Sequence, residues 1–170
     1  MKKLLIMICA GISLLMVGCT KNDIPTFTAA QIEFDAASWN ANGGGLTYPM
    51  MTRVPAYNAA TTSSNGALIT RTTGTIKLRV NVVGAQSSTD RNFTVKFNQA
   101  ESTGNPGVHF APVAATGVIP ANSSFGYVDF VILNPGPGTG TATAVLELTD
   151  NSVFKPSANY AKIGLSIALN

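Results

Sequence analysis

Hydrophobic and polar residues alternate one by one along several stretches of this chain. From Thr75 to Val83 the apolar side chains fall at every second position, and Lys77 and Arg79 lie between them. A period of two residues is typical of a β-strand with one buried face and one face in water. The same alternation predicts five further strands: Gln31 to Asp35, Asn92 to Phe97, Phe125 to Leu133, Thr141 to Leu148 and Lys162 to Leu169.

The alternation also predicts which side chains form the core and which face water. Tyr127 and Asp129 are expected to point outward, as are Glu33 and Asp35. The inward set is rich in branched and aromatic residues: Ile32, Phe34, Ile76, Leu78, Val80, Val82, Phe93, Val95, Phe97, Val128, Phe130, Ile132, Ala142, Ala144, Leu146, Leu148, Ile163, Leu165, Ile167 and Leu169.

Turn-forming residues separate the predicted strands, as in Gly84 to Asp90 and Asn134 to Gly140. No stretch combines a helical apolar stripe with capping residues. Strands with one apolar face each, and no helices, predict two antiparallel sheets packed face to face. We therefore expect an all-β fold, an immunoglobulin-like antiparallel β-sandwich of about seven or eight strands. A closed β-barrel is the alternative.

Two stretches carry no sustained alternation. Ala36 to Gly66 contains three consecutive glycines, and one short strand is expected in it, around Leu46 to Met51. Ser102 to Ser124 is rich in Gly, Pro, Ala and Asn, and only Val108 to Phe110 and Val118 to Ile119 are expected to be extended.

The N-terminus has the pattern of a secretory signal. Lys2 and Lys3 precede an apolar run of about 14 residues, which is too short for a membrane span of about 20. The run ends in Leu15-Met16-Val17-Gly18-Cys19. This end resembles the lipobox of bacterial lipoproteins, in which a small residue precedes a cysteine that is acylated and becomes the new N-terminus. Residues 1–18 are thus predicted to be a cleaved lipoprotein signal peptide and Cys19 to be the lipidated residue.

The expected mature protein is tethered to a membrane but does not span it, because acyl chains on Cys19 would anchor it. Residues 19–28 are predicted to be the lipidated end and a flexible tether, and residues 29–170 a single β-sandwich domain. Thr20 follows the cysteine, as in lipoproteins that are not retained in the inner membrane. The expected location is therefore the cell envelope, at the outer membrane.

Charge and cysteine content exclude several classes of protein. Charged residues make up 11% of the chain, against about 25% in an average domain. Loss of Lys2 and Lys3 leaves nine basic and eight acidic residues, a balance that cannot supply the basic surface of a nucleic-acid-binding protein. Cys9 leaves with the signal peptide, so no intramolecular disulfide is expected.

The sequence contains no constellation typical of an enzyme. His109 is the sole histidine, and neither a nucleophile elbow nor a phosphate-binding loop is present. Glu33 and Asp35 share one face of a predicted strand, as a glycosidase pair would, but the favoured interpretation is that both are ordinary carboxylates facing water. We expect a non-catalytic protein without a cofactor or a metal site.

Aromatic residues supply the candidate binding site. Trp39, Tyr48 and Tyr57 fall in the irregular segment from Ala36 to Gly66. Aromatic faces bind the apolar C–H patches of sugar rings, while neighbours such as Asn40, Asn42 and Asn58 bond the hydroxyls. The alternative is that Trp39 is a core residue that closes one end of the sandwich.

The stretch from Thr75 to Thr149 carries a series of short motifs in order: Ile76-Lys77-Leu78-Arg79-Val80, Asp90 to Val95, Gly107 to Phe110, Val118 to Ser124, Gly126 to Val128 and Leu146 to Asp150. This order resembles small lipoproteins of Bacteroidota whose domain of unknown function is related in pattern to the Calx-beta type of immunoglobulin-like sandwich. One departure matters. His109 stands where calcium-binding Calx-beta domains have Gly-x-Asp-Tyr, so calcium binding is not carried over.

The resemblance implies an accessory role at the surface or in the periplasm, because such proteins tend to be encoded beside outer-membrane glycan or nutrient uptake systems. The first functional hypothesis is therefore a module that binds glycan or another nutrient beside such uptake proteins. The second is a structural or protein–protein interaction module that docks a neighbouring envelope protein. An enzyme is the third.

Overall fold

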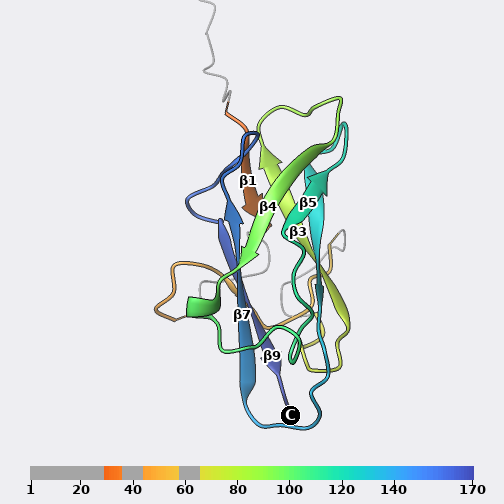
Figure 1. Cartoon of the computed structure of the whole chain (residues 1–170), viewed down its shortest axis with the longest axis vertical. Coiled ribbons are helices and arrows are strands. Elements are labelled where there is room, and N and C mark those ends of the chain that lie inside the picture. Colours follow the sequence, from red (N-terminus) through yellow and green to blue (C-terminus); the bar gives the residue numbers. More distant parts are fainter. Residues whose placement is uncertain (1–28, 36–43, 58–65) are drawn as a thin grey trace, which may run out of the picture.

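The chain folds into two β-sheets packed face to face in a computed structural model that describes residues 29–35, 44–57 and 66–170 (Figure 1). The four-stranded sheet has the order β6-β3-β1-β8 and the five-stranded sheet the order β2-β9-β7-β4-β5. The strands are β1 (Gln31–Phe34), β2 (Met50–Met51), β3 (Thr75–Val83), β4 (Arg91–Phe97), β5 (Thr116–Ile119), β6 (Phe125–Val131), β7 (Thr141–Thr149), β8 (Lys155–Pro156) and β9 (Lys162–Ala168).

The predicted all-β sandwich is confirmed. The seven strands of four or more residues pair antiparallel. The two-residue strands β2 and β8 are additional, and each joins a sheet edge in parallel, β8 beside β1 and β2 beside β9. A short strand was expected between Leu46 and Met51, and β2 lies there. Nothing in the sequence pattern pointed to β8, because two residues are too few to show a period.

The core lies between the sheets and is built from the inward positions of the alternating strands. In β3, Ile76, Leu78 and Val80 are buried while Thr75 and Lys77 are exposed. Burying such a side chain contributes about 1.5–3 kcal/mol, which sets the strand register. The largest fully buried side chains are Phe34, Phe93, Phe110, Phe130, Phe154, Ile32, Met51, Ile69, Ile76, Leu78, Ile119 and Leu146.

The edges of the two sheets are in contact where β5 meets β6. These strands belong to different sheets and are joined by a turn in which Asn122 has a φ of 58°. A Cβ on Gly126 would lie 2.1 Å from the Val118 carbonyl oxygen, so a side chain at that position would force the edges apart. The edges touch without sharing a hydrogen-bonded ladder, so the fold is a sandwich and the closed barrel is not formed.

Parts of the outer face of the five-stranded sheet are covered by other segments of the chain. On the five-stranded sheet, Val145 is buried although it points outward, because the segment around the 3₁₀ turn η2 (Gln99–Glu101) covers it. Gly164 of the same sheet lies beneath Met50 and Tyr48.

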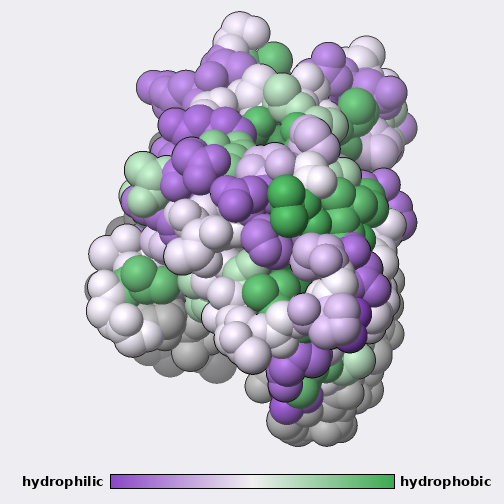
Figure 2. Space-filling view, turned by 60° about the horizontal axis from the view of Figure 1, so that its bottom comes forward, coloured by the Kyte–Doolittle hydropathy of each residue, from purple (hydrophilic) through white to green (hydrophobic). Residues whose placement is uncertain are grey.

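Figure 2, with the end near the C-terminus turned forward, shows hydrophobic residues in small groups among polar ones rather than in one broad patch. No helix among the described residues is long and apolar enough to cross a membrane.

Two local expectations are wrong. Val108 and His109 lie in a turn rather than in extended chain, because the His109 N–H donates to the Asn105 carbonyl and the Gly107 N–H to the Phe110 carbonyl. Asp35 does not face water. The chain leaves β1 at Phe34, and the Asp35 side chain is only 9% exposed, buried against Arg79. The expected extended stretch at Val118 to Ile119 is confirmed as part of β5.

Candidate functional site

An arginine surrounded by aromatic rings marks the outer face of the four-stranded sheet. The Arg79 guanidinium lies 5.2 Å from the centre of the Tyr57 ring and 5.0 Å from that of Phe125. Tyr127 stands directly across from Arg79 in the β3–β6 pairing. We call Tyr57, Arg79, Phe125 and Tyr127 the aromatic face.

Strand register explains why these side chains meet. Arg79 and Tyr127 are directly opposed, and Phe125 lies one outward position further along β6. Neighbours and diagonal neighbours on one face of an antiparallel pair are within reach of long and aromatic side chains. Phe125 packs edge-on against Tyr127 with ring centres 5.8 Å apart, and Tyr57 does the same from the other side at 6.2 Å. The rings therefore support one another around the arginine.

Tyr57 reaches the face because β1 is short. The Arg79 carbonyl accepts a bond from the Asp35 N–H at 2.9 Å, the last such bond at this end of β1. Among the described residues the Arg79 N–H has no backbone partner on that side, and it donates to the Tyr57 hydroxyl at 3.2 Å instead. Burial raises the pKa of Tyr57 above its ordinary 10.0, so the hydroxyl stays protonated at neutral pH.

Among the described residues, the rings of the aromatic face are partly exposed. Phe125 is 40% exposed, and Tyr57 and Tyr127 are half-buried. On the same face Lys77 forms an ion pair with Asp129 at 2.9 Å, and its ammonium lies 6.0 Å from the Tyr127 ring centre. Apolar ring surface bordered by polar groups is the combination that holds and orients a bound molecule.

The structure separates two of the residues expected to form one site. Tyr57 belongs to the aromatic face, whereas Tyr48 packs over Gly164 on the outer side of the five-stranded sheet. Tyr48 is buried, and the Lys162 ammonium lies 5.9 Å from its ring centre. Trp39 and the lipidation residue Cys19 lie outside the described residues, as do Asn40, Asn42 and Asn58, so their roles stay predictions.

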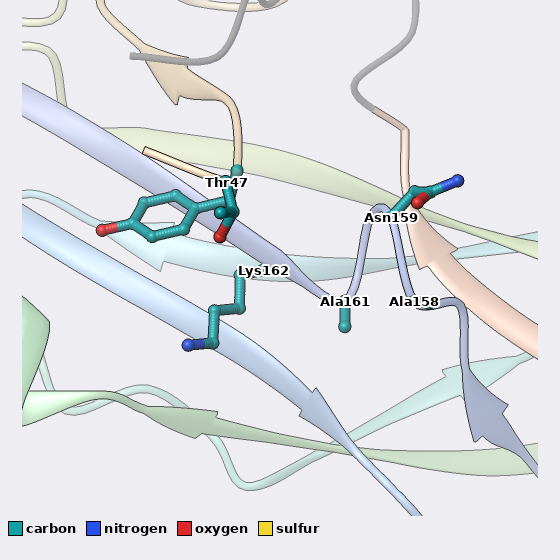
Figure 3. Close-up of a pocket in the computed structure, with 6 residues that line it drawn as sticks. Thr47, Ala158, Asn159, Ala161 and Lys162 are labelled. Carbon is teal, nitrogen blue, oxygen red and sulfur yellow. The ribbon is translucent and has the colours of Figure 1, made fainter. Parts of the chain in front are cut away.

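A small pocket borders Tyr48 (Figure 3). It forms between the chain before β2 and the turn between β8 and β9, and the Asn159 amide points away from the Lys162 ammonium in this view. Its volume is about 120 Å³, room for about four water molecules, whereas ligand pockets are typically about 300–1,000 Å³. Its lining residues are Thr47, Tyr48, Ala158, Asn159, Ala161 and Lys162.

The ionisable groups near this pocket have structural partners. Lys162 Nζ donates to Glu101 Oε1 at 2.8 Å, and this hydrogen bond raises the pKa of Lys162. Burial raises the pKa of Tyr48, and the Glu101 carboxylate adds to the rise. The ion pair joins the η2 turn to the start of β9. This pocket is a poor ligand site because it is small and because its lysine, Lys162, is already paired with Glu101.

Among the described residues, Glu33, Asp35 and His109 are not brought together as a catalytic group. Asp35 Oδ2 lies 2.6 Å from Arg79 Nη2, so the carboxylate is engaged in an ion pair and does not act with Glu33 as an acid–base pair. His109 uses its Nδ1 atom to accept a bond from the Asn105 N–H at 3.0 Å. That bond stabilises the turn that ends at the buried Phe110.

Comparisons with known proteins bear on the fold. No family model matches the chain, and no curated protein matches it either. The apo-form Calx CBD1 domain is similar in structure, with a TM-score of 0.52 and 10% identity over 82% of this chain and 97% of that one. The fold is a Calx-beta-like β-sandwich. This β-sandwich also resembles CBD12 from CALX1.2 and the calcium binding domain CBD12 of CALX1.1, each with a TM-score of 0.50, at 13% and 12% identity, over 59% of this chain and 40% of theirs.

One of these Calx structures is named as a calcium binding domain, so we asked whether the described side chains of this chain could hold a calcium ion. Ca²⁺ takes six to eight oxygen ligands, several of them carboxylate. Among residues 29–35, 44–57 and 66–170, no group of three or more His, Cys, Asp or Glu side chains is placed to hold a metal. Asp35 and Asp129 are in addition paired with Arg79 and Lys77. The described residues of this Calx-beta-like sandwich do not fit a calcium site.

Sequence reasoning missed the aromatic face as a unit. The alternation placed Arg79 and Tyr127 outward, but it left them as separate surface residues. Phe125 is two positions before Tyr127 on β6 and so points to the same outer side. This spacing was the one sequence feature that could have indicated that the two rings lie together. The residues come together because β3 pairs with β6, although residues 84–124 separate the two strands in the sequence. The alternation within one strand does not show which strand it will pair with.

Proposed function

We propose that this chain is a membrane-anchored, non-catalytic accessory lipoprotein of the cell envelope, at the outer membrane, that binds a glycan on its aromatic face beside an uptake system. The anchoring part rests on the Lys2-Lys3 start, the apolar run and the Gly18-Cys19 junction. The binding part rests on the geometry of Tyr57, Phe125 and Tyr127 around Arg79.

The arrangement of rings on an open sheet is the observation that carries the binding proposal. Sugar rings present apolar C–H patches that pack on aromatic surfaces, and their hydroxyls bond polar groups alongside. The polar groups here are Lys77, Asp129 and, by strand register, Asn81 beside Phe125. As far as the described residues show, the rings line a partly exposed sheet surface rather than a closed cavity, which suits a chain of sugar units better than one small molecule.

A glycan array on the soluble protein, residues 20–170, tests this function. All strands of both sheets lie within residues 31–168, so the truncation leaves the sandwich intact. Binding is expected, and Tyr127→Ala and Phe125→Ala should each weaken it about fivefold to tenfold through loss of an aromatic contact.

Val108→Ala is the matched control for Phe125→Ala. Val108 is 48% exposed in the turn where the His109 carbonyl accepts a bond from the Leu133 N–H. This turn lies past the end of β6 that is opposite Phe125, so the substitution removes exposed apolar surface away from the aromatic face. Binding should be unchanged in this variant. An array without any binding, or equal losses in the control and in the two aromatic variants, would contradict the proposal.

A docking module for a neighbouring envelope protein is the second candidate. Tyr, Phe and Arg, the residues of the aromatic face, are enriched at the centres of protein interfaces. A photo-crosslinker placed at Asn81, next to Phe125 in the register, separates the two functions in intact cells. Crosslinking to one defined envelope protein, lost in Tyr127→Ala, together with an empty glycan array, would favour docking.

A further inference from the structure

We propose that the aromatic face selects uncharged glycans, and that Asp35 and Asp129 set this selectivity by occupying the two cations that touch the rings. This inference rests on the proposed function and concerns the ligand class of the same face.

Each of the two cations beside the aromatic rings carries its own carboxylate. Arg79 bonds Asp35, which is 9% exposed, and Lys77 bonds the exposed Asp129 at 2.9 Å. An arginine lying between two rings would otherwise be well suited to bind a carboxylate or sulfate group, because the guanidinium fork matches planar and tetrahedral oxyanions. Here the protein itself supplies the anion.

The wider charge distribution of the face points the same way. By strand register, Glu33 of β1 and Lys155 of β8 share the outer side with the two pairs. Among the described residues of β1, β3, β6 and β8, with Asp35, three carboxylates therefore balance three cations. The face presents no net positive potential that would draw in an anionic chain.

The burial of Asp35 makes this arrangement durable. A carboxylate removed from water is strongly unfavourable unless it is paired and hydrogen-bonded. An anionic sugar competing for Arg79 would have to leave Asp35 buried without its partner. A neutral sugar needs no such exchange, because its hydroxyls bond the paired groups as they stand while its C–H patches cover the rings.

Binding of one polysaccharide in two charge states tests the inference. The probes are the neutral polysaccharide that binds best in the array and the same polysaccharide after partial sulfation, measured by affinity electrophoresis at about 20 mM salt. The unmodified protein is expected to prefer the neutral form at least tenfold. Asp129→Asn, which frees the exposed Lys77, should raise affinity for the sulfated form relative to the neutral form about fivefold. Asp35→Asn should do the same through Arg79.

Glu147→Gln is the matched control, because it frees Lys96, a lysine with which Glu147 pairs at 3.4 Å on the other sheet. It changes the net charge equally but away from the aromatic face, so affinity for the sulfated form should not rise. Asp129→Asn keeps the test valid if Asp35→Asn does not fold.

The outcomes separate the two proposals. A glycan-binding protein that prefers the sulfated form, or one whose preference is the same in Asp129→Asn and Glu147→Gln, would overturn the charge selectivity and leave glycan binding standing. A protein that binds neither form would overturn the proposed function, and the selectivity with it.

Discussion

Asp35 Oδ2 lies 2.6 Å from Arg79 Nη2, and this pair joins the end of β1 to the centre of β3. Arg79 in turn lies between the rings of Tyr57 and Phe125. One ion pair thus links β1 to the arginine of the aromatic face.

Asp35→Ala is expected to lower the free energy of unfolding by about 1–3 kcal/mol, because it leaves a partly buried guanidinium without its partner. Urea denaturation measures the change. Asp129→Ala breaks the exposed pair with Lys77, whose side chains are 63% and 57% exposed, and should cost no more than about 0.5 kcal/mol. Equal costs for the two substitutions would contradict the buried pairing.

Val80→Asp should destabilise the protein severely, because a charge would enter the core and the apolar burial of Val80 would be lost, about 1.5–3 kcal/mol for the apolar part alone. Thr75→Asp, at the exposed start of the same strand, should stay within about 0.5 kcal/mol. Arg79 is unsuitable as this control, although the sequence pattern placed it in water. Similar urea midpoints for Val80→Asp and Thr75→Asp would argue against the register of β3.

Gly126→Ala should destabilise the sandwich by about 1–3 kcal/mol, the usual effect of overpacking a tight contact. The added Cβ would meet the Val118 carbonyl oxygen at 2.1 Å, so β5 and β6 would have to separate. Gly44→Ala meets nothing within 4 Å and serves as the control in a thermal melt. An unchanged melting temperature for Gly126→Ala would show that the two edges do not touch.

Stability should fall as the pH rises above about 10, in part through Tyr57. Burial raises the folded-state pKa of this phenol above its ordinary 10.0, so above that pH the unfolded chain releases a proton that the folded chain keeps. The stabilisation is complete below pH 10 and is lost as the pH climbs through the folded-state pKa. Tyr57→Phe should therefore show a shallower decline in unfolding free energy between pH 9 and 11. A decline as steep as that of the unmodified protein would show that Tyr57 does not contribute.

Cys19→Ala should abolish incorporation of labelled palmitate in cells that process lipoproteins, because the acylated thiol would be absent. The protein should then accumulate as an uncleaved precursor or in soluble form, as seen by fractionation. Cys9→Ala, within the predicted signal peptide, is the control and should leave labelling intact. Continued labelling of Cys19→Ala would disprove lipidation at this residue.

Local alternation was enough to predict the long strands, but not how distant residues combine. In β3 and β6 every second residue is buried, so the sequence pattern and the core coincide. Asp35 followed the same pattern in sequence yet is buried, because its partner Arg79 is on another strand. Tyr48 and Tyr57 lie close in sequence, but they pack on opposite sheets because β2 and β3 belong to different sheets. Contacts of this kind depend on topology, which no single segment encodes.

The place of β1 within its sheet has a mechanical consequence for a tethered protein. β1 begins at one end of the molecule and is held antiparallel by β3 on one side and parallel by β8 on the other (Figure 1). A pull through the predicted N-terminal tether would act along the strand, and the ladder bonds run across it. The bonds on both sides of β1 would therefore bear the load together in shear, rather than open one after another like a zipper. A lipoprotein holding a large glycan against flow would gain resistance to unfolding at the strand where the force enters.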